Sequence, residues 1–248
     1  AELAGAFARG ETTPERHLKL LQQRIERLNP RLNAIVASDV HAVDAARDST
    51  SRLKTGRARS RLEGIPVVVK DNILVAGLPC VWGSRVFRDY VPATDELPVA
   101  RLRAAGAIIL GKTNVPELTF EGITWNPVFG ATRNPYDLRL TPGGSSGGSV
   151  AAVASGLVPL ALGTDGGGSI RRPASHAGVV GLKPSIGRVP RFPSLPNMLL
   201  DFEVIGPIAR TAADARLLLD AMSGAEPRDQ SSLCHPLAIE QGARDPLR

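Results

Sequence analysis

The chain has 248 residues, of which 43% are hydrophobic and 4% aromatic, and its formal net charge is +6 at pH 7. This length and composition are sufficient for a substantial apolar core in one α/β domain. No apolar run is long enough to cross a bilayer and no secretory leader opens the sequence, so we expect a cytoplasmic protein with no membrane partner. Arginines are spread over the chain and aromatic residues are few, which argues against a nucleic-acid partner.

The two cysteines, Cys80 and Cys234, lie far apart in the sequence and match neither a zinc-binding nor a CxxC spacing. We therefore predict two free thiols, with no disulfide framework and no structural metal. No cofactor is expected either.

Hydrophobic periodicity and turn residues predict alternating helices and strands. A helix should begin after the capping residue Thr13, with Pro14 in its first turn, and end at Pro30. The β-branched run GIPVVVKDN at residues 64–72 predicts a strand that is buried on both faces and ends at Lys70. Further helices are expected at 40–53, 95–105, 170–174 and 212–222, and further strands at 107–112 and 178–182. This alternation indicates an α/β sandwich.

We expect one catalytic core with an attached layer and a tail. Residues 1–55 are predicted to form an N-terminal helical layer of the same domain, and residues 56–222 the core. Residues 223–248 are polar and are predicted to be an irregular tail. The prolines, glycines and asparagines between residues 116 and 141 predict an ordered loop region rather than a repeat.

Two serine- and glycine-rich stretches are the strongest indication of function. They are GGSSGGS at residues 143–149 and GTDGGGSIR at 163–171, and they bracket apolar segments at 150–154 and 157–162. A flexible linker would stay polar on both sides, so we interpret both stretches as turns tied to the core. Consecutive N–H groups in such a turn form a cavity for negative charge. Phosphate-binding fingerprints are not matched, which favours an oxyanion hole with Ser169 as the nucleophile.

A serine nucleophile needs a base within hydrogen-bonding reach. His17 and His41 lie on predicted surface helices and His235 lies in the tail, so His176 is the remaining histidine, and no GxSxG elbow supports an ordinary triad. Lys70, at the end of an apolar strand, would lose hydration, which lowers the pKa of its amine and suits a base. The alternative is a lysine that reaches water from the strand end. A serine–lysine arrangement is therefore one open interpretation.

These motifs resemble those of the amidase signature family. The resemblance rests on GIPVVVKDN, GGSSGGS and GTDGGGSIRRPASHAGVVGLKPS, and it extends from about Gly64 to Met222. It also includes GKTN at 111–114, TRNP at 132–135 and GPIART at 206–211. The resemblance implies an α/β/α sandwich with a mixed central β-sheet, and hydrolysis of carboxamides through a Ser-cis-Ser-Lys triad.

Carried onto this chain, the resemblance implies a role for each residue of the triad. Ser169 is the nucleophile, Ser145 the bridging serine and Lys70 the base. Ser145 and Ser169 are separated by 24 positions, as in the family motif. The resemblance also implies a cis peptide bond between Gly144 and Ser145.

The resemblance implies an oxyanion hole and a set of supporting residues. The hole would consist of the backbone N–H groups of Gly166, Gly167, Gly168 and Ser169. Ser146, Asp165 and Arg171 would hold the turn by hydrogen bonds rather than react. Gly166 stands where members of the family usually carry a larger side chain, so a looser turn is expected. His176 also departs from the family pattern, and no role is assigned to it.

Members of that family are usually about twice as long as this chain. We therefore expect an N-terminal half, with a fold that is incomplete at its C-terminus. A missing C-terminal segment, or a second copy in a homodimer, would cover the uncovered strand edge of such a half-sheet. The resemblance implies a small-molecule amide as the partner in the site. It implies no metal or organic cofactor, because the chemistry uses only side chains and backbone donors.

Two other functions compete with that of an amidase. The first is the A subunit of a glutamine-dependent aminoacyl-tRNA amidotransferase, which uses the same triad within a complex. The sequences NVPEL at residues 114–118 and FPSLP at 192–196 resemble stand-alone amidases better, which favours the amidase. The second is a catalytically incompetent fragment or partner-binding homologue, which the intact Lys70, Ser145 and Ser169 argue against.

Overall fold

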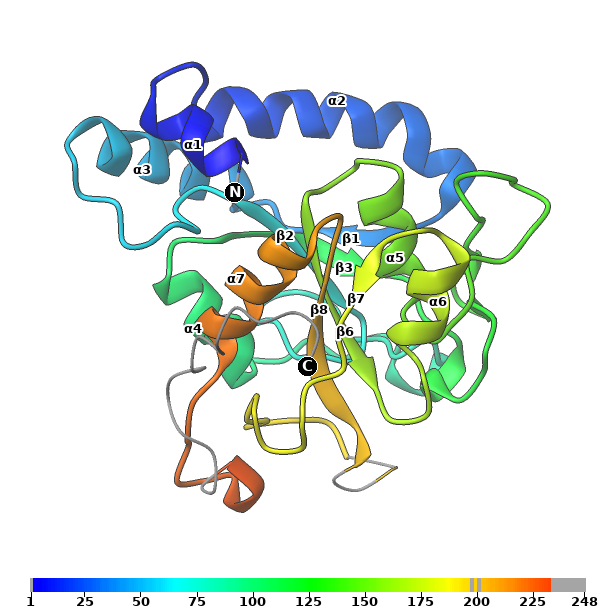
Figure 1. Cartoon of the computed structure of the whole chain (residues 1–248). Helices are drawn as coiled ribbons and strands as arrows, with labels where there is room; N and C mark the ends of the chain where they lie inside the picture. Colours follow the sequence, from blue (N-terminus) through cyan, green and yellow to red (C-terminus); the bar gives the residue numbers. More distant parts are fainter. Residues whose placement is uncertain (1, 197–198, 200–201, 233–248) are drawn as a thin grey trace, which may run out of the picture.

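The computed structural model describes residues 2–196, 199 and 202–232. The predicted thiol Cys234, His235 and most of the predicted tail lie outside the described residues. A six-stranded mixed sheet forms the centre, in the order β1-β3-β2-β6-β8-β7, and helices lie on both of its faces (Figure 1). This is the α/β/α sandwich with a mixed central sheet that the resemblance implied.

The strands of the main sheet run in both directions. They are β1 (Ile35–Ser38), β2 (Pro66–Lys70), β3 (Ile108–Thr113), β6 (Leu160–Asp165), β7 (Val180–Gly181) and β8 (Val204–Ala209). β2 is parallel to both β3 and β6, whereas β1, β8 and β7 are each antiparallel to their neighbours. A separate ribbon pairs β4 (Trp125–Asn126) with β5 (Gly130–Ala131). The carboxyl ends of the three parallel strands therefore meet at one edge, where α/β proteins commonly bind ligands.

Two layers of helices cover the sheet. The helices are α1 (Glu2–Ala8), α2 (Pro14–Leu32), α3 (Ala42–Lys54), α4 (Leu97–Ala104), α5 (Gly147–Ala154), α6 (Arg171–His176) and α7 (Ala212–Met222). Short 3₁₀ turns occupy Arg85–Phe87, Glu117–Thr119 and Gln230–Ser232. α4 and α7 pack on one face, and residues of α2, α3, α5 and α6 pack on the other.

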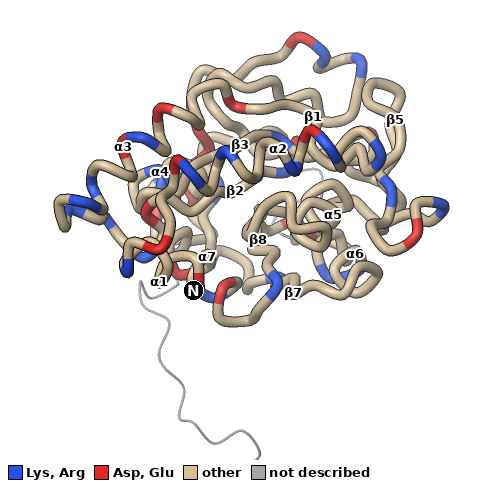
Figure 2. Tube along the Cα trace, turned by 90° about the horizontal axis from the view of Figure 1, so that it is seen from above, with Lys and Arg blue, Asp and Glu red and all other residues tan. Residues whose placement is uncertain are grey.

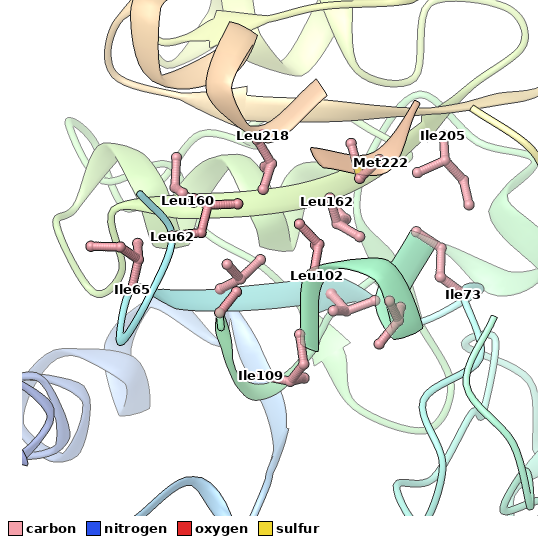
Figure 3. Packing of buried hydrophobic residues seen from close by; sticks show 14 of the residues in the cluster. Leu62, Ile65, Ile73, Leu102, Ile109, Leu160, Leu162, Ile205, Leu218 and Met222 are labelled. Carbon is pink, nitrogen blue, oxygen red and sulfur yellow. The ribbon is translucent and has the colours of Figure 1, made fainter. Parts of the chain in front are cut away.

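Both faces of the central strands are apolar, as expected for strands buried on two sides. Along β2, Val67 and Val69 face one core, whereas Val68 faces the other. Figure 3 shows the first core, where Leu102 of α4 and Leu218 of α7 pack against the sheet. Because successive side chains alternate, Lys70 falls on the same face as Val68, toward α5.

Most predicted elements are present, with shifted ends. The helix predicted to end at Pro30 continues to Leu32, because its end is set by Asn33, which adopts the left-handed conformation (φ 51°) and donates its N–H to Asn29 O. The strand predicted at 178–182 pairs only at Val180–Gly181. The layer predicted as helical also supplies β1, an edge strand.

The charges of the described residues are distributed around the molecule. Figure 2 shows Lys and Arg positions on many elements, interspersed with Asp and Glu. None of the described helices is both long and apolar enough to cross a membrane.

Candidate active site

The candidate active site lies where β2 and β6 end. These strands are parallel neighbours, so their last residues reach the same edge of the sheet. Lys70 is the last residue of β2, and Thr164 and Asp165 are the last two of β6. Ser145 lies just before α5 and reaches the Lys70 amine. Three segments that are distant in the sequence therefore meet at this edge.

The Lys70 amine is fully buried and has three acceptors around it. Nζ lies 2.7 Å from Ser145 Oγ, 2.8 Å from Thr164 Oγ1 and 3.3 Å from the Thr164 carbonyl oxygen. A charged lysine would donate to all three. A neutral amine has two hydrogens and one lone pair, so it can donate to both Thr164 oxygens and accept the Ser145 proton. The arrangement therefore suits a neutral amine that acts as a base.

Burial lowers the pKa of Lys70 from 10.5 to about 7. The charges of Glu203 and Asp165 raise it, and that of Arg191 lowers it further. A substantial fraction of the amine is therefore neutral near pH 7, as the sequence analysis required of a base.

The segment that carries Ser145 is held from several sides. The Gly144–Ser145 peptide bond is cis, as the resemblance implied. The Gly144 carbonyl accepts a hydrogen bond from Arg172 at 2.8 Å, and the Gly143 carbonyl accepts one from Thr124 at 2.7 Å. Ser145 is buried, so its hydroxyl is directed to Lys70 rather than to bulk water.

Ser169 is joined to this segment through the backbone. The N–H of Ser146 donates to the Ser169 carbonyl at 3.0 Å, and the Ser146 hydroxyl donates to the Thr164 carbonyl at 3.2 Å. Ser169 is partly exposed beside the exposed Gly167. Among the hydrogen bonds found in the described part of the chain, none involves the Ser169 hydroxyl. The structure thus brings Lys70 and Ser145 into contact. It also joins Ser169 by a backbone hydrogen bond to Ser146, the residue that directly follows Ser145.

Asp165 organises the turn between β6 and α6. Its carboxylate accepts the backbone N–H groups of Gly168, Ile170 and Arg171 at 2.7–3.1 Å, and the Arg171 guanidinium binds both of its oxygens at 3.0 Å. Burial alone would raise the pKa of Asp165, but these hydrogen bonds lower it to about 2. Because the Gly168 N–H is directed to Asp165, it cannot also point at an oxyanion. Of the four N–H groups expected in the oxyanion hole, the Gly168 N–H is thus engaged by Asp165.

A second network of buried polar residues, which the sequence analysis missed, adjoins Lys70. Asn72 donates to Thr164 Oγ1 at 3.1 Å and to Glu203 Oε1 at 3.0 Å. Arg191 contacts Glu203 at 3.4 Å and Glu96 at 2.8 Å. Asn72 could have been suspected because it directly follows the VVVKD run, whereas Glu203, just before β8, carries no such signal.

Other candidate residues lie elsewhere. His176 is exposed at the end of α6. Cys80 is a buried free thiol, and burial raises its pKa to about 11, so it is a poor nucleophile. Within the described residues, no group of three or more His, Cys, Asp or Glu side chains could hold a metal ion.

Comparison with known proteins decides the family. The family model described as Amidase matches residues 16–247. The chain belongs to the amidase family. This is the family that the sequence motifs resemble.

Two curated relatives of similar sequence are A subunits of glutamyl-tRNA(Gln) amidotransferase. The A subunit of glutamyl-tRNA(Gln) amidotransferase from Syntrophobacter fumaroxidans is 43% identical over all 248 residues, which correspond to 51% of its own length. The same subunit from Deinococcus radiodurans is 42% identical, with the same coverage. The chain spans about half the length of the curated relatives it matches.

Among solved structures, peptide amidase from Stenotrophomonas maltophilia matches 95% of this chain and 50% of its own. The TM-score is 0.90 and the sequence identity 39%. A bacterial aryl acylamidase of the amidase signature enzymes matches with a TM-score of 0.86 and 37% identity, over 93% of this chain and 48% of its own.

Proposed function

We propose that this chain carries the catalytic half of an enzyme that hydrolyses a carboxamide to a carboxylate and ammonia or an amine. The observation that carries the proposal is the 2.7 Å hydrogen bond between the Lys70 amine and the Ser145 hydroxyl, because burial holds the pKa of that amine at about 7. The amidase-family membership and the similarity to peptide amidase and aryl acylamidase structures support the same reaction class.

In the proposed acylation, neutral Lys70 accepts the proton of Ser145 while Ser145 accepts the proton of Ser169. Ser169 Oγ bonds to the amide carbon, and the carbonyl electron pair moves to its oxygen. The carbon–nitrogen bond then breaks, and the proton held by Lys70 returns through Ser145 to the leaving nitrogen. Water repeats the sequence on the acyl-enzyme and releases the carboxylate and free Ser169.

The backbone N–H groups of Gly166, Gly167 and Ser169 are proposed to stabilise the oxyanion. Loss of one such donor typically costs about 2.7–4 kcal/mol of transition-state stabilisation. The supporting residues act on this turn: Asp165 and Arg171 hold it by hydrogen bonds, and Ser146 binds both the Ser169 and Thr164 carbonyls. No step of this mechanism uses a metal or an organic cofactor.

The proposal is tested by labelling the chain with a fluorophosphonate probe and mapping the adduct by mass spectrometry. We expect one adduct, on Ser169, and none in Ser169→Ala. Ser51→Ala, an exposed serine on α3, is the control and should label like wild type. Lys70→Met should slow labelling by about 10²–10⁴-fold, because it removes the general base. A folded wild-type chain without an adduct would contradict the proposal and favour the catalytically incompetent homologue.

A second candidate function is favoured by the curated relatives. These two A subunits of the amidotransferase are 42–43% identical to this chain, which is higher than the 39% identity to the peptide amidase structure. In such a complex, the same triad would release ammonia from glutamine. Release of ammonia from glutamine only after the partner proteins are added would favour the amidotransferase. Hydrolysis of simple amides by the isolated protein would favour the amidase.

A further inference from the structure

A chain of buried hydrogen bonds leads from Lys70 away from the proposed nucleophile. The amine donates to Thr164 Oγ1 at 2.8 Å, and Asn72 Nδ2 donates to the same oxygen at 3.1 Å. Asn72 Nδ2 also donates to Glu203 Oε1 at 3.0 Å. Lys70, Asn72, Thr164 and Glu203 are each at most 9% exposed, so solvent contributes little to this arrangement.

The Glu203 carboxylate determines the orientation of the Asn72 amide. A carboxylate only accepts hydrogen bonds, so the amide must turn its NH₂ group toward Glu203. In that orientation both Asn72 hydrogens are donated, whereas Oδ1 is buried and finds no hydrogen-bond partner among the described residues. A buried amide oxygen without a partner is unfavourable. The opposite orientation would place Oδ1 against Glu203, so the negative charge fixes the observed one.

This orientation of the Asn72 amide determines how the Thr164 hydroxyl interacts with the Lys70 amine. Asn72 and Lys70 both donate to Thr164 Oγ1, so the two acceptor positions of the hydroxyl are occupied. With that hydroxyl acting as an acceptor, a neutral Lys70 keeps its lone pair for the Ser145 proton. Glu203 thus influences the base through two intervening side chains.

Glu203 also contacts a buried arginine. Arg191 Nη1 contacts Glu203 Oε1 at 3.4 Å, and Arg191 Nε donates to Glu96 Oε1 at 2.8 Å. The other oxygen of Glu96 accepts the backbone N–H of Leu74 at 3.2 Å. Arg191 is therefore shared by two buried carboxylates, and it links Glu203 to Glu96.

We propose that Glu203 is a positioning residue for Lys70: through Asn72 and Thr164 its carboxylate orients the amine and controls how readily it gives up its proton. The inference rests on the proposed function, because Lys70 is the general base in the proposed mechanism. Glu203 does not touch the reacting atoms, and neither resemblance nor family membership assigned it a role.

The charges around Lys70 agree with this role. Burial has the largest effect on the pKa of Lys70 and lowers it. The charge of Glu203 has the next largest effect and raises this pKa. Asp165 at the end of β6 also raises that pKa, and Arg191 lowers it. Arg191 partly offsets the Glu203 charge, so removal of Glu203 alone should make the Lys70 proton easier to lose.

The experiment measures Lys70 directly, without relying on activity. The chain has five lysines, Lys19, Lys54, Lys70, Lys112 and Lys183, so [ε-¹³C]lysine labelling gives a small set of resonances. Lys70→Met identifies the Lys70 resonance by its disappearance. In wild type its titration midpoint is expected at about pH 7. In Glu203→Gln, which keeps an acceptor oxygen for Asn72 and Arg191 but removes the charge, the midpoint should move to lower pH.

Glu63→Gln is the matched control. Glu63 is also buried and paired with arginines, Arg52 and Arg59, but it lies before β2, at the end opposite Lys70. Its replacement should leave the Lys70 midpoint unchanged. The proposal would be overturned if the Lys70 titration midpoint in Glu203→Gln equals the midpoint in Glu63→Gln or moves to higher pH.

Asn72→Ser is the second variant, and it tests the positioning role even if Glu203→Gln does not fold. It removes the link between Glu203 and Thr164 and leaves the Glu203–Arg191 pair intact. We expect slower fluorophosphonate labelling of Ser169 even at a pH well above the Lys70 midpoint, and a wild-type labelling rate would contradict the positioning role. If Ser169 fails to label in wild type, the proposed function fails, whereas the Lys70 titration still decides the effect of Glu203.

Discussion

At the scale of single residues, Lys70 is the least ordinary feature of the chain. A lysine is rarely buried completely, because the loss of hydration disfavours its charged form. Here the nearest partners of the amine are the neutral oxygens of Ser145 and Thr164, and the carboxylates of Glu203 and Asp165 offset the effect of burial only in part. Lys112, by contrast, is buried beside Asp71, with Nζ 3.2 Å from the carboxylate. The two buried lysines should therefore respond to substitution in opposite ways.

We predict that Lys70→Met stabilises the folded chain. The pKa of Lys70 is about 7 when folded, against an ordinary value of 10.5, so between these pH values the unfolded chain binds a proton that the folded chain does not. Wild-type stability should therefore rise with pH across this range, and the penalty is complete below about pH 7. Lys70→Met should raise the free energy of unfolding at pH 6 by a few kcal/mol, on the order given by the pKa shift. Urea denaturation at pH 6 and pH 10 measures the difference, which should shrink at the higher pH.

The contrasting variant is Lys112→Met, which leaves Asp71 without its ion-pair partner. Removing one partner of a buried pair typically costs about 3–5 kcal/mol, so this variant should lower the free energy of unfolding. If Lys70→Met lowers stability by a similar amount at pH 6, the Lys70 amine is not held in an unfavourable environment, and the pKa of about 7 would be wrong.

At the scale of elements, glycines allow α5 to approach the sheet closely enough to deliver Ser145. The N–H of Gly148 donates to the Asn114 carbonyl at 3.2 Å. A Cβ at Gly148 would lie 2.4 Å from Asn114 N and 2.8 Å from the Ala34 carbonyl oxygen, both of which are backbone atoms. The first turn of α5 is thus packed directly on the backbone that follows β3 and precedes β1.

We predict that Gly148→Ala destabilises the fold, because backbone atoms cannot move aside as the end of a flexible side chain can. A cost of roughly 1–3 kcal/mol or more is expected from overpacking. Gly167→Ala is the control: no atom lies within 4 Å of a Cβ there, and its backbone needs no left-handed conformation. It should match or slightly exceed wild-type stability. Urea unfolding curves of the two variants should separate clearly, and coincident curves would mean that α5 can shift away from Asn114.

Local sequence patterns predicted β2 and β3 as buried strands but did not predict β1 or β8. The VVVK run and the AIIL run are apolar enough to be recognised as buried strands. β8 was harder to predict because Pro207 lies in its middle, where proline is normally excluded from an interior strand, yet β8 pairs with both β6 and β7. β1 is short and follows a helix directly, so its pattern is too brief to be distinctive.

The site shows the same division. Lys70, Ser145 and Ser169 could be proposed as catalytic residues because each lies in a distinctive motif. Thr164 and Glu203 could not, because their roles depend on β2, β6 and β8 being neighbours in the sheet. Partners that meet only through strand pairing leave no spacing pattern in the sequence.

At the scale of the whole molecule, long-range polar contacts join elements that the apolar cores alone would not fix. Arg101 of α4 donates to the carbonyl oxygens of Met222, Gly224 and Ala225, just at and after the end of α7, at 2.9–3.1 Å. Carbonyls at a helix C-terminus lack partners within the helix, and a guanidinium satisfies several at once. The contact therefore fixes the chain where it leaves the sandwich, on the face formed by α4 and α7.

We predict that Arg101→Ala weakens this connection without disturbing the opposite face of the sheet. A hydrogen bond from a charged donor typically contributes about 1.5–3 kcal/mol to stability. The three bonds here come from one side chain, so their contributions should not simply add. We therefore expect the free energy of unfolding to fall by roughly 2–3 kcal/mol. Proteolysis in native buffer should cut the variant faster after residue 222, while the Lys70 resonance keeps its wild-type midpoint because α4 does not touch the amine.

The control is Arg139→Ala, which removes a solvent-exposed ion pair with Asp137 and should leave the free energy of unfolding close to that of wild type. Equal stability losses in the two arginine variants would show that the contact with the end of α7 adds nothing beyond an ordinary surface interaction.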